Sequence, residues 1–216
     1  SEDIDLDNGD AIPVDNLSVD LVAFFQNTFG YSQVTAKTQQ GEMGILRTTL
    51  KFPILFSLGL SAYNNEALHL KVEISQHRQT AIIRRTPVLV YSRSFVPAHF
   101  SLETMMAGKM LACLERNFHR GSEGAVIKGR DFYDLLWFMQ QGIQPYAEKL
   151  EKDGREPYTV ESAMLKLQEK VKQIRAADLE VDLLPLFEQR SFVAAWIEAF
   201  QDNFTTLVAR YLQRPS

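Results

Sequence analysis

The sequence at residues 68–75, Leu-His-Leu-Lys-Val-Glu-Ile-Ser (LHLKVEIS), alternates apolar and polar side chains after a turn-forming segment, AYNNEA, at residues 62–67. This pattern is typical of a β-strand with one face in the core. Because residues i and i+2 of a strand share a face, we expect Lys71 and Glu73 on the side opposite Val72 and Ile74. Charges in this position form either an ion pair on a solvated sheet face or part of a functional site.

The first residues, SEDIDLD, contain a second alternating stretch, in which Ile4 separates Asp3 from Asp5. Carboxylates at close range disfavour each other's ionised state unless a cation lies between them. If this strand lies beside the strand that contains Glu73, three carboxylates come together, and such a set of oxygen ligands suits Mg²⁺. Two such ions about 3.5–4 Å apart stabilise the attacking and leaving oxygens of a phosphoryl or nucleotidyl transfer. The alternative for the first residues is a frayed, solvated tail.

The pattern along the chain changes from strands to helices. Residues 17–30 predict an amphipathic helix with Ser18 as its N-cap and Gly30 at its end. Residues 44–58 and 86–95 predict further strands, and from Ser101 onward apolar residues recur at helical spacing. We therefore expect an α+β fold, with a mixed sheet domain over residues 1–98 and a helical domain over residues 99–216.

Composition excludes several classes of protein. A chain of 216 residues with 45% hydrophobic and 23% charged residues is globular and can bury a sizeable core. Its net charge of −4 argues against a generally basic nucleic-acid binder but allows a local basic patch. No signal peptide and no membrane-spanning run of about 20 apolar residues is visible, so we expect a cytoplasmic protein without membrane contact. The single cysteine, Cys113, is expected to be buried, and the four histidines lack the spacing of a zinc motif.

A second group of charges lies in the helical part. Lys109 falls within an apolar stretch, MMAGKMLACL, and GRDFYDLLWF at residues 129–138 predicts a helix with Asp131 and Asp134 in its first turn. The segment before this helix, HRGSEGAVIK at residues 119–128, predicts a basic loop. Lys109 and this loop thus accompany the Arg130–Asp131 pair. The alternatives are an ammonium that reaches the surface and acids that compensate the helix dipole.

Together these residues resemble the nucleotidyltransferase superfamily, and within it the AbiEii/AbiGii-type toxin nucleotidyltransferases, which include the mycobacterial MenT group. Asp3 and Asp5 are similar to the paired metal-binding acids, and Val72-Glu73-Ile74 is similar to the third acid with its apolar neighbours. Lys109 and the stretch GRDFYDL at 129–135 are similar to the later motifs. SEDIDL matches the family's S-x-D-x-D stretch with Ser1 as the serine, and the resemblance runs to about residue 140.

The resemblance implies a nucleotidyltransferase-like sheet domain with Asp3, Asp5 and Glu73 as catalytic ligands of Mg²⁺ or Mn²⁺. It implies that Lys109 holds the phosphates of an NTP and that Asp131 orients this lysine or helps to activate the attacking hydroxyl. The expected nucleotide-binding residues are Ser1, Lys71, Lys109 and Arg130. Enzymes of this kind are toxins of toxin–antitoxin or phage-defence systems, neutralised by an antitoxin, and some act on the tRNA acceptor end.

The superfamily places a Gly-Gly or Gly-Ser turn before its paired acids, whereas this sequence begins at Ser1. We expect a native segment before Ser1. Two functions stay open: a metal-dependent toxin that transfers a nucleotide from an NTP to an RNA such as tRNA, and a catalytically inactive binding module of the same fold.

Basic residues that could contact RNA are present despite the acidic total. They are either a local basic groove or scattered surface charges: Arg84, Arg85, Arg116, Arg120, Lys128 and Arg130. Tyr133, Trp137 and Phe138 are expected in the core, with stacking on bases as the alternative.

Overall fold

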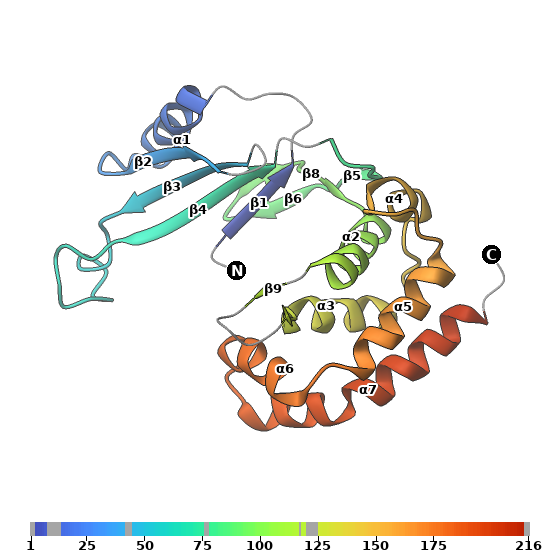
Figure 1. Ribbon diagram of the computed structural model, residues 1–216. Helices are drawn as coiled ribbons and strands as arrows, with labels where there is room; N and C mark the ends of the chain where they lie inside the picture. The colour runs from blue at the N-terminus through green and yellow to red at the C-terminus, as the bar shows by residue number, and fades with distance from the viewer. Residues whose placement is uncertain are drawn as a thin grey trace. The chain divides into compact units, whose positions relative to one another are not determined.

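The computed structural model describes residues 3–7, 14–41, 45–75, 78–116, 118–119 and 125–213, with the backbone alone for 3–5, 14–15, 118–119 and 125–126. The chain forms two compact units, Ser1–Gln79 and Thr80–Ser216. Figure 1 shows the elements of both. Residues 80–98 group with the helices, and the domain boundary expected after residue 98 stays a prediction.

A four-stranded mixed sheet forms the first unit, in the order β1-β4-β3-β2. β1 runs parallel to β4, and the β3–β4 and β2–β3 pairs are antiparallel. The stretch at 68–75 is therefore a central strand, as its alternation predicts, and it lies directly beside the first strand. The strands are β1 (Asp3–Asp7), β2 (Thr35–Gln40), β3 (Leu46–Phe52) and β4 (Leu68–Ser75).

One face of this sheet packs against α1 (Val14–Phe29). Alternating residues of β3 are buried, and Val72 and Ile74 of β4 join the same core. Leu21 and Phe25 of α1 pack on this cluster. The helix ends before Gly30, whose φ of +67° is a left-handed conformation that glycine adopts without strain. The polar residues that alternate with the buried residues of β3 and β4 point to the other face of the sheet.

The second unit begins with a hairpin-like arm. β5 (Ile83–Arg85) pairs with β8 (Ala98–Phe100), and between them β6 (Val88–Val90) pairs with β7 (Arg93–Phe95). The sequence predicts one strand over residues 86–95, and this prediction is wrong. Tyr91 and Ser92 adopt positive φ angles of 49° and 62°, which turn the chain without any glycine to indicate it.

Helices build the rest of the second unit around one apolar core. Ser101 caps α2, and Thr159 forms a capping box with Ser162 at the start of α5. Phe200 and Phe204 are fully buried in this core. The remaining elements are α2 (Leu102–Glu115), β9 (Phe118–His119), β10 (Ala125–Val126), α3 (Gly129–Gln140), α4 (Ala147–Asp153), α5 (Val160–Lys172), α6 (Ala176–Leu183), η2 (Leu184–Leu186) and α7 (Arg190–Leu212).

The α+β fold class is confirmed: a mixed sheet precedes a region of helices. Two local predictions are wrong. The strand expected over 44–58 ends at Phe52, because Pro53 has no N–H to donate to a ladder. Ser18 is not an N-cap but lies inside α1, which begins at Val14. Within the described ranges, no helix has the length and apolar character needed to span a membrane.

Candidate active site

The acidic positions of the first unit lie on neighbouring strands. In the parallel β1–β4 pair, Asp3 is opposite Lys71 and Asp5 is opposite Glu73. Because Val72 and Ile74 are buried in the core, the pleat puts positions 71 and 73 on the other face. Positions opposite one another on paired strands share a face, so positions 3, 5 and 73 belong to one patch of the sheet. Ser1 and the side chains of Asp3 and Asp5 lie outside what the structure describes.

Glu73 is bound by an arginine of the next strand. Arg47 is opposite Glu73 in the β3–β4 pair, and its Nε donates a hydrogen bond to Glu73 Oε1. The side chains of Glu73 and Arg47 are 26% and 52% exposed, so water screens this ion pair and it adds little to stability. An exposed pair of this kind can exchange one cation for another.

The donor set of the first unit fits a divalent metal ion. Hard cations such as Mg²⁺ and Mn²⁺ prefer carboxylate oxygens, and Asp5 and Glu73 are neighbours in register. Among the side chains that the structure describes, which do not include Asp3 and Asp5, no three His, Cys, Asp or Glu residues cluster closely enough to hold a metal. Metal binding by Asp3, Asp5 and Glu73 stays a prediction.

A second group of charges joins α2 to α3 in the second unit. Lys109 Nζ of α2 donates to Asp131 Oδ1 of α3 at 2.8 Å and lies 2.9 Å from Asp134 Oδ2. Arg116, just after α2, donates to Asp131 Oδ2 at 3.0 Å. The Asp131 side chain is only 3% exposed, so a nearly buried carboxylate accepts from one cation on each oxygen. Asp131 thereby fixes the position of Lys109.

The Lys109 ammonium is stabilised in its charged form. Burial alone would lower the pKa of Lys109, but hydrogen bonds and charges from Asp131 and Asp134 outweigh it and raise the pKa above the ordinary value. The side chain is 26% exposed, so a fixed cation keeps access to solvent. Such a group is suited to bind an anionic oxygen of a ligand.

Further cations lie close to Asp131. Lys128, immediately before α3, and Lys170 of α5 line a small hollow together with Arg116 and Asp131. Burial lowers the pKa of Lys128, and repulsion from Arg130 and other nearby cations lowers it further. Burial also lowers the pKa of Lys170. Crowded cations with depressed pKa values favour the binding of an anion such as phosphate.

Gly129 allows the start of α3 to lie against α6. A Cβ at Gly129 would stand 3.2 Å from Asp182 Cβ and 3.3 Å from Leu179 Cα, closer than most side-chain contacts. The Gly129 N–H donates to Asp182 Oδ2 at 2.7 Å, which satisfies one amide at the helix start. The glycine of the GRDFYDL stretch therefore helps to place Asp131 two residues later.

The structure also shows the burial and contacts of the other residues that the sequence analysis names. Cys113 is buried, and burial raises the pKa of its thiol, as expected of a small core residue. Phe138 is buried and Tyr133 packs on the rings of Phe187 and Trp196, as predicted, but the prediction that Trp137 lies in the core is wrong, because it is 44% exposed. The basic residues predicted for RNA contact separate into three sets: Arg84, Arg85 and Arg130 are exposed, Arg116 and Lys128 adjoin Asp131, and Arg120 lies outside the described residues.

Two contacts are not predicted from the sequence. Arg47 alternates with Leu46 and Thr48 in β3, and this pattern places its side chain on the same sheet face as Glu73. That alternation is the signal that identifies it once strand order is known. Arg116 is expected at an RNA surface, yet it binds Asp131. No local pattern indicates this, because the contact depends on how α2 and α3 pack.

A toxin family matches nearly the whole chain. The sequence model of the family described as "Nucleotidyl transferase AbiEii toxin, Type IV TA system" matches residues 1–213. The match extends through the C-terminal helices, beyond the residues on which the sequence resemblance is based. No curated protein matches the chain.

Proposed function

Because the chain belongs to the AbiEii family of nucleotidyltransferase toxins from type IV toxin–antitoxin systems, we propose that it transfers a nucleotide from an NTP to an RNA acceptor. The RNA acceptors include tRNA. The reaction requires Mg²⁺ or Mn²⁺ and takes place in the cytoplasm. The register that sets Asp5 beside Glu73 on adjacent parallel strands is the observation that carries this proposal. A cognate antitoxin opposes the activity, and phage defence is its biological setting.

In this proposal the first unit supplies the metal ligands. Asp3, Asp5 and Glu73 hold the divalent ion, and Lys71, opposite Asp3, contacts the nucleotide. The bound ion contributes neutralisation of phosphate charge. Glu73 reaches this role by exchanging its ion pair with Arg47, which the exposure of both side chains permits.

The second unit supplies fixed positive charge for the phosphates. Lys109 is held by Asp131 and Asp134, Lys128 precedes α3, and Arg130 is the second residue of that helix. An RNA hydroxyl oxygen forms a bond to the α-phosphorus while the bond to the bridging oxygen breaks, pyrophosphate leaves, and the hydroxyl proton passes to water. Transfer of this kind needs charge stabilisation and alignment rather than covalent chemistry from the protein.

Asp131 acts in this scheme as a positioning residue. Its carboxylate is nearly buried, and each of its oxygens already accepts a hydrogen bond from a cation. A group with its lone pairs engaged in this way is poorly suited to take a proton from an attacking hydroxyl. Of its two expected roles, orientation of Lys109 is the one that these contacts support.

Transfer of label from each α-labelled NTP to total RNA, with Mg²⁺ or Mn²⁺, tests the proposal. We expect labelled RNA from the wild type, none from Asp5→Ala, and wild-type labelling from Asp20→Ala, which removes an exposed carboxylate of α1. Absence of transfer with all nucleotides, both metals and purified tRNA would contradict the proposal.

The Arg47–Glu73 ion pair favours one alternative, a catalytically inactive protein of the same fold that acts as a binding module. In that case Asp3→Ala and Asp5→Ala leave growth inhibition in the host unchanged. Loss of growth inhibition in parallel with loss of transfer would exclude the alternative.

A further inference from the structure

One segment of the chain is strongly basic although the protein is acidic. Residues 74–102 contain four arginines and two histidines but no aspartate or glutamate. The net charge of the whole chain is −4, so the remainder is more acidic still. A concentration of one sign of charge in one stretch of a chain attracts ligands of the opposite sign.

The arm, residues 83–100, carries most of this charge on an exposed surface. Arg84 and Arg85 in β5 and Arg93 in β7 are all exposed. Tyr91 at the turn is 95% exposed, and Phe95 in β7 is 51% exposed. The arm therefore presents both guanidinium groups and aromatic rings to solvent.

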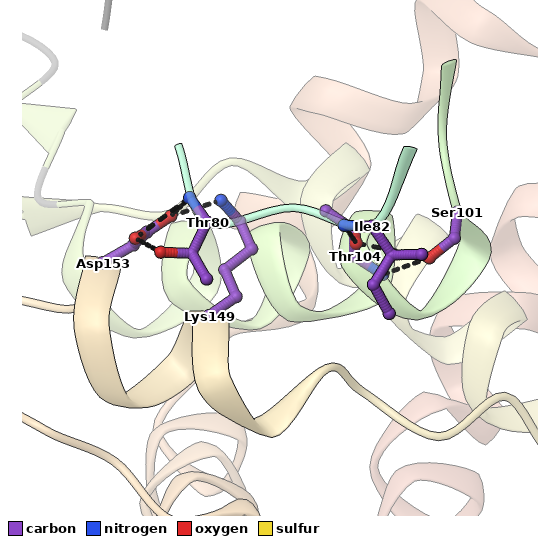
Figure 2. A network of polar contacts seen from close by, with 6 residues as sticks. All are labelled: Thr80, Ile82, Ser101, Thr104, Lys149 and Asp153. Carbon is purple, nitrogen blue, oxygen red and sulfur yellow. Dashed lines mark hydrogen bonds and ion pairs between the residues drawn. The ribbon is translucent and has the colours of Figure 1, made fainter. Parts of the chain in front are cut away.

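Both ends of the arm are fastened to the helices by a polar network, shown in Figure 2. Before the arm, the Thr80 N–H and hydroxyl donate to Asp153, which also accepts from Lys149 Nζ at 2.7 Å. The Ile82 N–H donates to Thr104 Oγ1 at 2.9 Å. After the arm, the Ser101 N–H donates to the Ile82 carbonyl oxygen at 2.8 Å.

This anchorage is largely buried. Lys149, Thr104 and Ser101 are each less than 5% exposed. Burial of Asp153 opposes its ionisation, but hydrogen bonds from Lys149 and Thr80 outweigh this and lower the pKa of Asp153. Buried hydrogen bonds thus hold both ends of the arm, which reduces the conformational freedom that its backbone loses on binding.

Cross-strand register places Arg93 at the end of the β6–β7 pair, next to the turn that contains Tyr91. Arg93 is opposite Val90, the residue that precedes Tyr91. At the base, Arg84 is opposite His99, whose ring is fixed by contacts to Thr86 Oγ1 and the Phe100 carbonyl oxygen. Arg93 and Phe95 are two residues apart in β7 and therefore share a face, which places a guanidinium group beside an exposed aromatic ring.

We propose that the arm binds a single-stranded segment of the RNA acceptor, with its arginines on phosphates and Tyr91 and Phe95 stacked on unpaired bases. This inference rests on the proposed transfer to RNA. An acidic protein surface would also attract the arginines, but unpaired bases account in addition for a tyrosine ring left almost wholly in solvent.

Fluorescence anisotropy with a labelled RNA of about 12 nucleotides, without NTP or metal, tests the arm separately from catalysis. The test variant is R84Q/R85Q/R93Q. The matched control is K172Q/R190Q/R210Q, which removes three exposed charges from α5 and α7. The melting temperature of each variant establishes that it is folded.

We expect the arm variant to weaken RNA binding about tenfold or more at about 0.1 M salt and to reduce the slope of log Kd against log salt by about 2. The control retains wild-type affinity. Y91A/F95A keeps the salt slope and weakens binding by between about fivefold and a hundredfold, because stacking is lost but no charge changes. Asp5→Ala retains full RNA binding.

Wild-type affinity for RNA in both arm variants would overturn the inference and leave the proposed transfer standing. Transfer to RNA by a wild-type chain that does not bind this oligonucleotide would have the same meaning. Loss of binding to the antitoxin or to anionic lipid vesicles, with RNA binding intact, would also overturn the inference and assign the arm to that partner. Absence of RNA transfer under all conditions contradicts the proposed function itself.

Discussion

Two carboxylates of this protein, Glu73 in the sheet and Asp131 in the helical unit, are each paired with cations but in different surroundings. Glu73 shares one exposed arginine on the polar face of the sheet. Asp131 is 3% exposed and holds two cations, one on each oxygen. The exposed pair can be rearranged by a ligand at little cost, whereas the buried group has no solvent to replace a lost partner. The first arrangement suits ligand exchange, and the second suits fixed placement of a lysine.

The largest effect is expected for Glu73→Gln. If Glu73 exchanges Arg47 for a metal ion, the amide should lower nucleotide transfer at least about a hundredfold, because it binds a divalent cation weakly. The free energy of unfolding should change by less than about 0.5 kcal/mol, since the pair is exposed. Initial rates of label transfer and urea unfolding measure the two quantities.

Arg47→Gln is the matched control for this pair. It breaks the same ion pair but keeps the carboxylate, so transfer should persist at a metal concentration equal to or below that of the wild type. Equal loss of transfer in both variants would contradict the exchange and assign the ion pair a structural role.

Asp131→Asn should have the larger effect on stability. It leaves Lys109 and Arg116 beside a neutral amide, and loss of one member of a buried ion pair is strongly destabilising. Because Arg116 is half exposed and Asp134 still contacts Lys109, we expect about 2 kcal/mol. Urea unfolding measures it. Asp134→Asn, which changes a 47% exposed side chain, should cost less than about 1 kcal/mol. Similar losses in the two variants would contradict the distinction between buried and exposed partners.

Gly129→Ala tests whether the contact between α3 and α6 positions the buried carboxylate of Asp131. The added methyl would meet Asp182 and the Leu179 backbone at 3.2–3.3 Å, so α3 must shift slightly. We expect a loss of about 1–2 kcal/mol in urea unfolding. Gly108→Ala is the control, because its Cβ would meet only the end of the Lys149 side chain, at 3.4 Å. Gly154→Ala is unsuitable, because its Cβ would come within 2.6 Å of a carbonyl oxygen. Gly108→Ala should be neutral or stabilising, and equal loss in both would show that the α6 contact does not matter.

Local sequence patterns predict some of the elements of this fold but not the partners of Glu73 and Asp131. The strand at 68–75 and the helix end at Gly30 follow from local patterns, and the structure has them. The partners do not follow from local patterns. The Arg47–Glu73 contact requires the register of β3 against β4, and the bonds of Asp131 to Lys109 and Arg116 require the packing of α2 on α3.

The same limit explains the errors. A turn at Tyr91 and Ser92 has no glycine to mark it, so two short strands are predicted as one. Ser18 is a good N-cap residue by type, yet α1 begins earlier along the chain, at Val14.

The smallest expected effect is a dependence of ATP affinity on pH that arises from Lys128. Burial and the neighbouring cations lower its pKa below the ordinary value of 10.5, so the protonated form is disfavoured in the free protein. Bound phosphates favour the ammonium form, and ATP binding should therefore take up a proton as the pH approaches this lowered pKa. Affinity should fall as the pH rises through this lowered pKa toward 10.5. Lys109 does not contribute in this range, because its own pKa is raised by Asp131 and Asp134.

Calorimetry in buffers of different ionisation enthalpy measures this proton uptake. Lys128→Arg supplies the control, since a guanidinium keeps its charge throughout the range and the pH dependence should shrink to the part due to Lys170, whose pKa burial also lowers. An unchanged pH dependence in Lys128→Arg would show that the phosphates do not contact Lys128 beside Asp131. The buried carboxylate would then be a structural element of the helical unit, and only the exposed pair on the sheet would retain a role in binding the nucleotide.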